Sequence, residues 1–550
     1  MKRNLNYRRR PTSEVKIGNV KVGGDAPVIL QSMTSTSTMD TPGSVAQIER
    51  IADAGGEMVR LTAQGEREAV NLTEIRDRVR EEGYDTPLVA DIHFSPKAAF
   101  AAAERVEKVR INPGNFVDPG RVFRKIEFTD EEYAAEIGKI ERGLLPLLEI
   151  CRAHGTALRI GVNHGSLSDR IMSRYGDTPA GMVESAMEFL RVCVAHDFKD
   201  VVISIKASNV RVMTETVRRL VKAMDAEDMH FPLHLGVTEA GDGEDGRVKS
   251  AVGIGSLLVD GIGDTIRVSL SEAPEAEIPV ARAITDHVVS ISNHLPQAEE
   301  VEVAETFDDA DPAPRRGRFS PKVPVVVGLD LQPDAGWIDL TVENFDDRIN
   351  EILAAPERYV VANLSAVAPV TEGKVILHRL AEAGAENPVI LHRDYSDTPT
   401  DTTITAAIEM GSLLLSGYSD GLWIEDKKMT KEQLESLALN VLQATRQRIS
   451  KTEYISCPGC GRTLYDLQTA IARIKEATGH LTGLKIGIMG CIVNGPGEMA
   501  DADYGYVGAG VGNVSLYKGK QCMVKNIPTE EALPRLIQLI KDNGDWKDPE

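Results

Sequence analysis

The sequence predicts an α/β protein. A (β/α)8 TIM barrel comes first, a partial barrel-like α/β domain is inserted after it, and an α+β domain with three cysteines ends the chain. Three observations support this order: short apolar runs alternate with helical stretches at the start, part of this pattern returns later, and the pattern changes where the cysteines gather. The expected boundaries are 1–295 for the barrel, 296–321 for a linker, 322–448 for the insert and 449–550 for the last domain.

The barrel prediction rests on eight apolar runs, each short enough to form one strand. Helix-like segments such as 66–82 and 209–226 lie between them. Strands that alternate with helices form right-handed βαβ units, and eight such units match a TIM barrel in number and length. The expected strands are 28–34, 58–63, 87–93, 108–115, 157–166, 200–208, 231–240 and 264–272.

Polar side chains gather at the C-terminal ends of these strands, where TIM barrels build their active sites. Polar loop ends are common, and this alone accounts for Thr34 and Asn112. It does not account for five cations at one rim in a chain of net charge −21. Arg and Lys donors match phosphoryl oxygens, so the rim predicts a phosphate or diphosphate pocket. The rim residues are Thr34, Arg60, Asp91, His93, Arg110, Asn112, Arg159, Asn163, Lys206, Glu239, Arg267 and Ser269.

Overall charge and hydropathy exclude some classes of protein. The net charge of −21 disfavours nucleic acid as a partner, because binding phosphates needs a basic surface. No run of about 18 apolar residues is present, so no membrane helix is expected. The basic N-terminus lacks the apolar stretch of a secretory signal, and we expect a cytoplasmic protein.

The segment after the barrel is strongly acidic. Seven acidic residues and no basic one lie between Glu299 and Asp311, and prolines and arginines follow. This composition predicts an exposed linker. A substrate-mimicking acidic arm is the alternative.

The insert contains a partial repeat of the barrel. GSLLVDGIGDTIRVS (255–269) aligns with GSLLLSGYSDGLWIE (411–425) at an offset of 156 residues, and FPLHL (231–235) aligns with NPVIL (387–391) at the same offset. The shared offset favours duplication of the last strand–helix units over chance similarity.

The copy has lost the chemistry of the original. Tyr395 stands where the barrel has Glu239, and Trp423 stands where it has Arg267. We therefore expect the insert to be a spacer and not a second catalytic site.

Three cysteines near the C-terminus form a candidate soft-metal site. Cys457 and Cys460 are spaced C-x-x-C in SCPGCGR, and Cys491 lies in GCIVNGPGE. A structural zinc would need a fourth ligand, for which His480 and Cys522 are candidates at unusual spacing. An iron–sulfur cluster held by three thiolates is the other interpretation, and it leaves one iron with an exchangeable ligand.

Glu498 is the candidate for that exchangeable ligand. The Gly-Pro-Gly turn before it permits a tight loop that would bring its carboxylate back toward Cys491. An exposed loop carboxylate is the equally weighted alternative.

A series of motifs carries a resemblance to a known family. The chain is similar to the flavodoxin- or ferredoxin-dependent 4-hydroxy-3-methylbut-2-enyl diphosphate synthases of the methylerythritol phosphate isoprenoid pathway, and to their three-domain subgroup, although its insert is short. The matching motifs include QSMTSTSTMDT (31–41), VRINPGN (109–115), RIGVNHGSL (159–167), GVTEAGDGEDGRVKSAVGIG (236–255), KTEYISCPGCGRTLYDLQ (451–468) and GCIVNGPGEMADADYGYVG (490–508).

The resemblance implies a reductive dehydroxylation and ring opening of 2-C-methyl-D-erythritol 2,4-cyclodiphosphate to 4-hydroxy-3-methylbut-2-enyl diphosphate. It implies a 4Fe-4S cluster on Cys457, Cys460, Cys491 and Glu498, with flavodoxin or ferredoxin as the electron donor. Glu239 is the candidate proton donor. The implied substrate-binding residues are Arg60, Asp91, His93, Arg110, Asn112, Arg159, Asn163, Lys206, His234, Arg267 and Ser269. We expect a monomer or a homodimer in which the last domain closes on the barrel.

Two other functions fit the residues alone. One is a barrel lyase or aldolase that acts on a phosphate ester and carries a zinc-stabilised last domain. The other is a non-catalytic iron–sulfur redox sensor. Iron content and turnover distinguish all three.

Overall fold

The computed structural model describes residues 1–118, 127–304, 308, 318–333, 336–417, 419–492 and 499–549. Contacts divide the chain into two compact units. The first comprises Met1–Arg10, Arg247–Ile262 and Arg282–Ser450, and the second comprises Pro11–Gly246, Gly263–Ala281 and Lys451–Glu550. The predicted domain boundaries stay a prediction. No described helix combines the length and apolar character needed to cross a bilayer.

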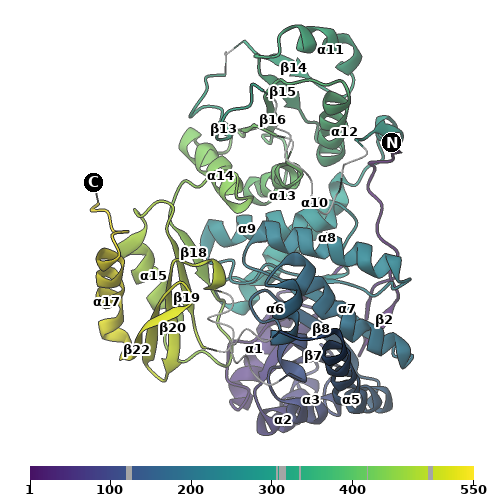
Figure 1. Ribbon diagram of the computed structural model, residues 1–550, viewed down its shortest axis with the longest axis vertical. Coiled ribbons are helices and arrows are strands. Elements are labelled where there is room, and N and C mark those ends of the chain that lie inside the picture. The colour runs from purple at the N-terminus through teal and green to yellow at the C-terminus, as the bar shows by residue number, and fades with distance from the viewer. Residues whose placement is uncertain are drawn as a thin grey trace. The chain divides into compact units, whose positions relative to one another are not determined.

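The second unit contains the predicted barrel, and all eight expected strands are confirmed (Figure 1). The strands are parallel and follow the order β10-β11-β4-β5-β6-β7-β8-β9. A parallel bridge between Ile203 and Leu233 joins β9 to β10 and closes the ring. The strands are β4 (Ile29–Met33), β5 (Met58–Ala63), β6 (Leu88–Ile92), β7 (Lys108–Ile111), β8 (Ala157–Asn163), β9 (Val201–Lys206), β10 (His234–Leu235) and β11 (Thr265–Ile266).

Helices connect successive strands, and several begin at strong capping residues. Thr129 and Glu132 form a capping box at the start of α5, and the Asn209 side chain accepts two main-chain N–H bonds at the start of α8. Both α9 and α10 continue from the second unit into the first. The helices are α1 (Thr41–Asp53), α2 (Glu66–Glu81), α3 (Pro96–Ala103), α4 (Pro113–Phe116), α5 (Asp130–His154), α6 (Asp169–Tyr175), α7 (Pro179–Ala195), α8 (Val210–Ala226), α9 (Gly243–Leu258) and α10 (Glu277–Ile291).

A short hairpin covers the N-terminal end of the barrel. Strands β2 (Val15–Ile17) and β3 (Val20–Val22) pair antiparallel. Their apolar side chains pack on residues at or near the starts of barrel strands, including Met58 and Ala157. Because this end is filled, the C-terminal ends of the strands are left for a site.

The inserted segment forms a five-stranded parallel sheet in the order β13-β17-β16-β15-β14. Its strands are β13 (Val325–Val326), β14 (Ile338–Leu340), β15 (Val360–Asn363), β16 (Val389–Asp394) and β17 (Gly421–Glu425). Its helices are α11 (Phe345–Ala354), α12 (Pro369–Glu382), α13 (Thr402–Leu415) and α14 (Lys431–Ala444). Alternating strands and helices agree with a partial barrel.

Within the first unit, the duplicated helices α9 and α13 pack on each other reciprocally. A Cβ at either glycine of this contact would come within 3 Å of the opposite side chain, so the helices approach more closely than larger residues permit. Ser256 and Ser412 are themselves related by the repeat of 156 residues, and the two glycine contacts are equivalent to each other under the same repeat. The contacts join Ser256 with Ser412, Gly255 with Ile408, and Val252 with Gly411.

The predicted exposed linker is partly wrong. Val301–Glu302 form β12, which pairs antiparallel with β1 (Lys2–Arg3). Val301 and Val303 are both buried. The cause is the alternation of valines with glutamates, which is a strand pattern despite the net negative charge. Most of the predicted linker after residue 304 lies outside the described residues.

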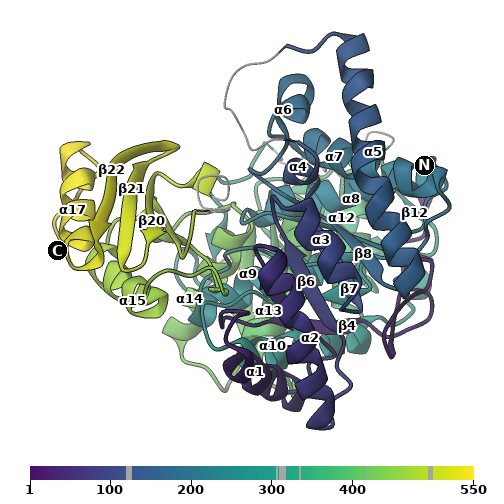
Figure 2. The ribbon, with the colours of Figure 1, turned by 90° about the horizontal axis from the view of Figure 1, so that it is seen from below.

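The C-terminal part of the second unit is an α+β domain, as predicted (Figure 2). Its sheet has the order β18-β19-β20-β21-β22, and α15 (Leu467–Thr478) and α17 (Thr529–Asp542) pack on one face. The sequence analysis missed β22, whose exposed and half-buried residues alternate at a sheet edge. The strands are β18 (Glu453–Ser456), β19 (Lys485–Met489), β20 (Tyr504–Gly510), β21 (Asn513–Lys518) and β22 (Gln521–Pro528).

Lys108 is a buried lysine inside the barrel. Its side chain is fully buried at the start of β7, and its Nζ lies 3.4 Å from both Gln31 Oε1 and Met58 Sδ. In the described part of the chain no carboxylate pairs with it. Burial, followed by the charges of Arg159 and Arg60, lowers the pKa of Lys108 well below its ordinary value. The barrel therefore contains a basic group that loses its proton more readily than it would in the unfolded chain.

Lys108→Met should stabilise the protein at neutral pH. The folded state binds this proton less tightly than the unfolded state, so the native lysine costs stability below the ordinary lysine pKa of about 10.4. We expect the free energy of unfolding at pH 7 to rise by about 1–4 kcal/mol, and the gain to shrink as the pH approaches that value. Urea unfolding at several pH values measures it. Lys199→Met, at an exposed site, is the control, and a lower urea midpoint for Lys108→Met would contradict the assignment.

Candidate functional site

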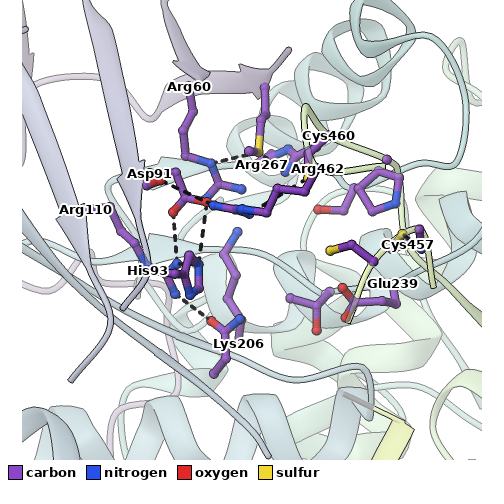
Figure 3. Close-up of a pocket in the computed structure, with 18 of the residues that line it drawn as sticks. Arg60, Asp91, His93, Arg110, Lys206, Glu239, Arg267, Cys457, Cys460 and Arg462 are labelled. Carbon is purple, nitrogen blue, oxygen red and sulfur yellow. Dashed lines mark hydrogen bonds and ion pairs between the residues drawn. The ribbon is translucent and has the colours of Figure 1, made fainter. Parts of the chain in front are cut away.

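A pocket in the second unit lies at the C-terminal ends of the barrel strands, and residues of the C-terminal domain complete its wall (Figure 3). Barrel cations line one part, and the three predicted cysteines line another. The lining residues are Met33, Arg60, Asp91, His93, Arg110, Arg159, Asn163, Ser204, Lys206, Thr238, Glu239, Arg267, Ser269, Cys457, Pro458, Gly459, Cys460, Arg462, Met489, Gly490 and Cys491.

The pocket brings together most of the residues predicted from the sequence, but two substrate candidates lie elsewhere. Asn112 ends β7 and caps α4, where its Oδ1 accepts the main-chain N–H of Gly114 at 3.0 Å. His234 lies fully buried in β10, with Nδ1 3.4 Å from Thr265 Oγ1. Neither side chain is on the pocket wall. Glu498 lies outside the described residues.

Asp91 is the hub of the charged network. Its Oδ1 accepts a hydrogen bond from Arg110 Nη1 at 2.9 Å, and its Oδ2 lies 3.2 Å from Arg462 Nη2. Burial alone would raise the pKa of Asp91, but Arg60 and Arg110 hold it well below its usual range. Asp91 is therefore an ionised carboxylate that orients arginines.

His93 is neutral in this network. Its Nε2 lies 2.5 Å from Arg110 Nη1, so the neutral ring nitrogen accepts a hydrogen bond from the guanidinium group. Burial and the nearby Arg110 lower the pKa of His93 to about 3. The imidazole stays uncharged at every pH at which the protein is handled.

Arg159 and Lys206 form no ion pair in the described part of the chain. Arg159 is 1% exposed, and its Nε and Nη1 have no hydrogen-bond partner among the described residues. Lys206 Nζ also forms no hydrogen bond within that part of the chain. Burial, followed by the neighbouring Arg60, lowers the pKa of both groups well below their ordinary values. Buried donors without acceptors are costly, and a bound anion would supply the missing acceptors.

Arg267 differs from these two because it already has a partner. Its Nε and Nη2 donate to the two carboxylate oxygens of Glu277 at 3.1 and 2.9 Å. Both side chains are buried. Arg267 therefore adds less uncompensated charge to the pocket than the sequence implied.

Glu239 is held in an unusual backbone conformation. Its φ is +51°, in the left-handed region that non-glycine residues rarely adopt. Its Oε2 is buried without a hydrogen-bond partner among the described residues. The next residue, Ala240, forms a parallel bridge with Ser456 at the end of β18. This bridge places Glu239 beside Cys457 (Figure 3).

The three cysteine sulfurs share one wall of the pocket. The main-chain N–H of Gly490 donates to Cys457 Sγ at 3.2 Å, as it would to a thiolate. Burial, together with the nearby Cys491 and Cys460, raises the pKa of Cys457 well above its ordinary value. Three clustered thiolates in a buried site need a positive centre, and this donor set suits a soft metal or an iron–sulfur cluster.

The three cysteines lie on one wall, but their sulfur atoms are not arranged around a single metal ion. Within the ranges the structure describes, no group of three His, Cys, Asp or Glu side chains has metal-holding geometry.

Eight of the lining residues were not predicted as site residues: Met33, Ser204, Thr238, Pro458, Gly459, Arg462, Met489 and Gly490. All of them except Arg462 are uncharged. Arg462 had a signal, because a cation two residues after a cysteine pair is a natural neighbour for thiolates. Burial opposes its charge, but Cys460 and Asp91 outweigh burial and raise its pKa above the ordinary arginine value.

Comparison with known proteins identifies the family. Residues 12–282 match the GcpE TIM-barrel domain, and residues 453–542 match the GcpE protein C-terminal domain. A 4-hydroxy-3-methylbut-2-en-1-yl diphosphate synthase (flavodoxin) of Parabacteroides distasonis is 55% identical, covering 98% of this chain and 99% of the relative. Proteins of the same name from Porphyromonas gingivalis and Leptospira interrogans are 51% and 41% identical, over 98% and 99% of this chain and 99% and 98% of theirs. The chain belongs to the GcpE family, together with these 4-hydroxy-3-methylbut-2-en-1-yl diphosphate synthases (flavodoxin).

Proposed function

We propose that this chain carries out the reaction of its family. The substrate is 2-C-methyl-D-erythritol 2,4-cyclodiphosphate, which is dehydroxylated and opened by two electrons to 4-hydroxy-3-methylbut-2-enyl diphosphate. The observation that carries the proposal is the pocket itself: the uncompensated cations Arg159 and Lys206 share it with three cysteines. A diphosphate satisfies the cations, and the cysteines provide for a redox group.

The barrel residues bind and orient the diphosphate. Arg159 and Lys206 have unused donors for phosphoryl oxygens, and Arg60 stands beside them with its pKa lowered to about 10 by burial. Asp91 and His93 hold Arg110 in place and do not compete for the anion, because one is already paired and the other is neutral. As the ring opens, these cations stabilise the charge that develops on the freed diphosphate.

Members of this family are iron–sulfur oxidoreductases, and the cysteines fit that group. We propose that Cys457, Cys460 and Cys491 hold a 4Fe-4S cluster, with Glu498 as the fourth ligand by resemblance. Such a cluster, held by these cysteines, would supply electrons one at a time. The Gly490 N–H bond to Cys457 stabilises thiolate charge, which agrees with this donor set.

Glu239 is positioned to hold the proton that the leaving hydroxyl requires. Its Oε2 is buried and unpartnered among the described residues, and Figure 3 shows the carboxylate beside Cys457 and facing the barrel cations. A left-handed conformation costs about 1–3 kcal/mol and persists where its surroundings fix it. Here the Ala240–Ser456 bridge supplies that constraint.

Contacts between the C-terminal domain and the barrel would help to shield the pocket from water. Ser271 Oγ donates to the main-chain oxygen of Cys457 at 2.9 Å, beside the pocket. A dry pocket strengthens every charge interaction inside it.

Electrons must come from an outside carrier. The matched relatives carry the word flavodoxin in their names, and we propose flavodoxin as the donor, with ferredoxin as the alternative.

Arg159→Met should weaken substrate binding and strengthen the fold. The variant removes donors that only an anion satisfies, so we expect affinity for the cyclodiphosphate to fall about 10- to 100-fold. The free energy of unfolding should not fall, because a buried unpaired cation is removed. Calorimetric binding to oxidised protein and urea unfolding measure the two effects. Arg78→Met, on an exposed face, is the control. Equal affinity for both variants would contradict the anion site.

Substrate binding should take up protons through Lys206. Its pKa is lowered in the free pocket, and a bound anion favours the charged amine, so binding raises the pKa again. We expect net proton uptake at pH values between the lowered pKa of Lys206 in the free pocket and its higher pKa in the complex, and its loss in Lys206→Met. Calorimetry in buffers of different ionisation enthalpy measures uptake, with Lys199→Met as the control. Identical uptake in wild type and Lys206→Met would exclude this assignment.

Anaerobic turnover of the cyclodiphosphate with a chemical reductant or reduced flavodoxin tests the whole proposal. We expect the wild type to bind iron and sulfide and to release the open diphosphate, and Cys491→Ser to lose the iron and the turnover. Cys522→Ser should keep both, because Cys522 lies in the same domain but outside the pocket. Zinc in place of iron would favour a lyase. An iron-containing protein without turnover would favour a redox sensor.

A further inference from the structure

Arg462 has no role in the reaction described so far, yet it joins two distant parts of the chain. It stands two residues after Cys460 and is only 6% exposed. Its Nη2 lies 3.2 Å from Oδ2 and 3.3 Å from the main-chain oxygen of Asp91 in β6. A cysteine-bearing turn and a barrel strand, 371 residues apart in sequence, are thus connected inside the pocket.

The backbone beside Arg462 is pressed against the barrel. A Cβ at Gly461 would lie 2.6 Å from the main-chain oxygen of Thr36 and 2.7 Å from Thr62 Oγ1. A backbone oxygen cannot swing aside as the end of a long side chain can. The turn therefore sits directly on the loop that follows β4 and on the end of β5, and this contact helps to direct the arginine.

The same guanidinium also lies next to a sulfur. Arg462 Nη1 is 3.9 Å from Cys460 Sγ, while Nη2 contacts Asp91. Asp91 uses its other oxygen for Arg110, at 2.9 Å. Loss of Arg462 would leave the barrel pair of Asp91 and Arg110 intact and remove only the connection to the cysteines.

Other ion pairs link the same domains but are less buried. Lys475 pairs with Asp242, and Lys451 pairs with Asp245, with side chains 25% to 37% exposed. Water and salt screen such partly exposed pairs more than a buried one. The Arg462–Asp91 pair has side chains only 5% and 4% exposed, so it is the pair that sets geometry.

We propose that Arg462 is a positioning residue that fixes the approach of the cysteine thiolates to the anion site of the barrel. The proposal rests on the proposed function, because it assumes that the cysteines act on a substrate held by Arg159 and Lys206. An arginine suits this position better than a lysine, since its planar fork contacts the carboxylate and the sulfur at once. Substrate affinity depends on the barrel and should not depend on Arg462.

Steady-state kinetics with a chemical reductant separate positioning from binding. We expect Arg462→Gln to lower kcat by about tenfold or more and to leave KM within about twofold, because the reacting groups are misplaced and not lost. Arg462→Lys should recover part of kcat. The control is Lys475→Gln, which removes a pair of the same two domains outside the pocket and should stay near wild type. A normal kcat in Arg462→Gln overturns the proposal. A KM that rises by more than about twofold in this variant overturns it too.

Two further measurements do not depend on turnover. Iron and sulfide content should be unchanged in Arg462→Gln, and loss of iron would assign the arginine to cluster assembly and overturn the positioning role. Amide hydrogen exchange of the full-length protein should accelerate at residues 456–463 and at residues 36–38 in Arg462→Gln but not in Lys475→Gln. Unchanged exchange rejects the proposal. If the wild type lacks reductase activity the proposed function fails, and the exchange result still decides the role of Arg462.

Discussion

The Asp91 carboxylate contacts one arginine of its own barrel and one of the C-terminal domain, and the pocket depends on this double contact. One oxygen holds Arg110 at 2.9 Å, and the other faces Arg462 at 3.2 Å. Without this carboxylate, no negative charge near β6 would offset the repulsion among the buried arginine and lysine side chains of the pocket. Arg60, Arg159 and Lys206 line the same pocket and form no ion pair among the described residues, so a bound anion can balance their charge.

The barrel was predictable because its signal is local and repeated. Each strand is a short apolar run, and its polar end residue falls on the one rim where parallel strands finish. The C-x-x-C pair and Cys491 were equally visible. β22 was not, because an edge strand with exposed residues lacks the apolar run that marks the others. The start of the linker was predicted to be exposed, because its many acidic residues outweighed the alternating valines in the prediction. The structure instead places Val301 and Glu302 in β12.

The details of the site depended on contacts that sequence does not contain. Arg267 looked like a free cation until Glu277, ten residues away, was found to neutralise it. Asn112 follows β7 and His234 begins β10, but Asn112 caps α4, His234 contacts Thr265 of β11, and neither lines the pocket. The contact of Arg462 with Asp91 spans 371 residues, and only the folded chain shows it.

The bridge between Ala240 and Ser456 has a consequence for how the protein can change over time. It joins the loop of the barrel acid to the strand of the first cysteine through main-chain atoms alone. Main-chain pairing tolerates most side-chain replacements, so the contact between the Glu239 loop and β18 does not depend on the side chains that form the bridge. Side chains around the bridge can therefore change during evolution while the Glu239 loop keeps its register with β18.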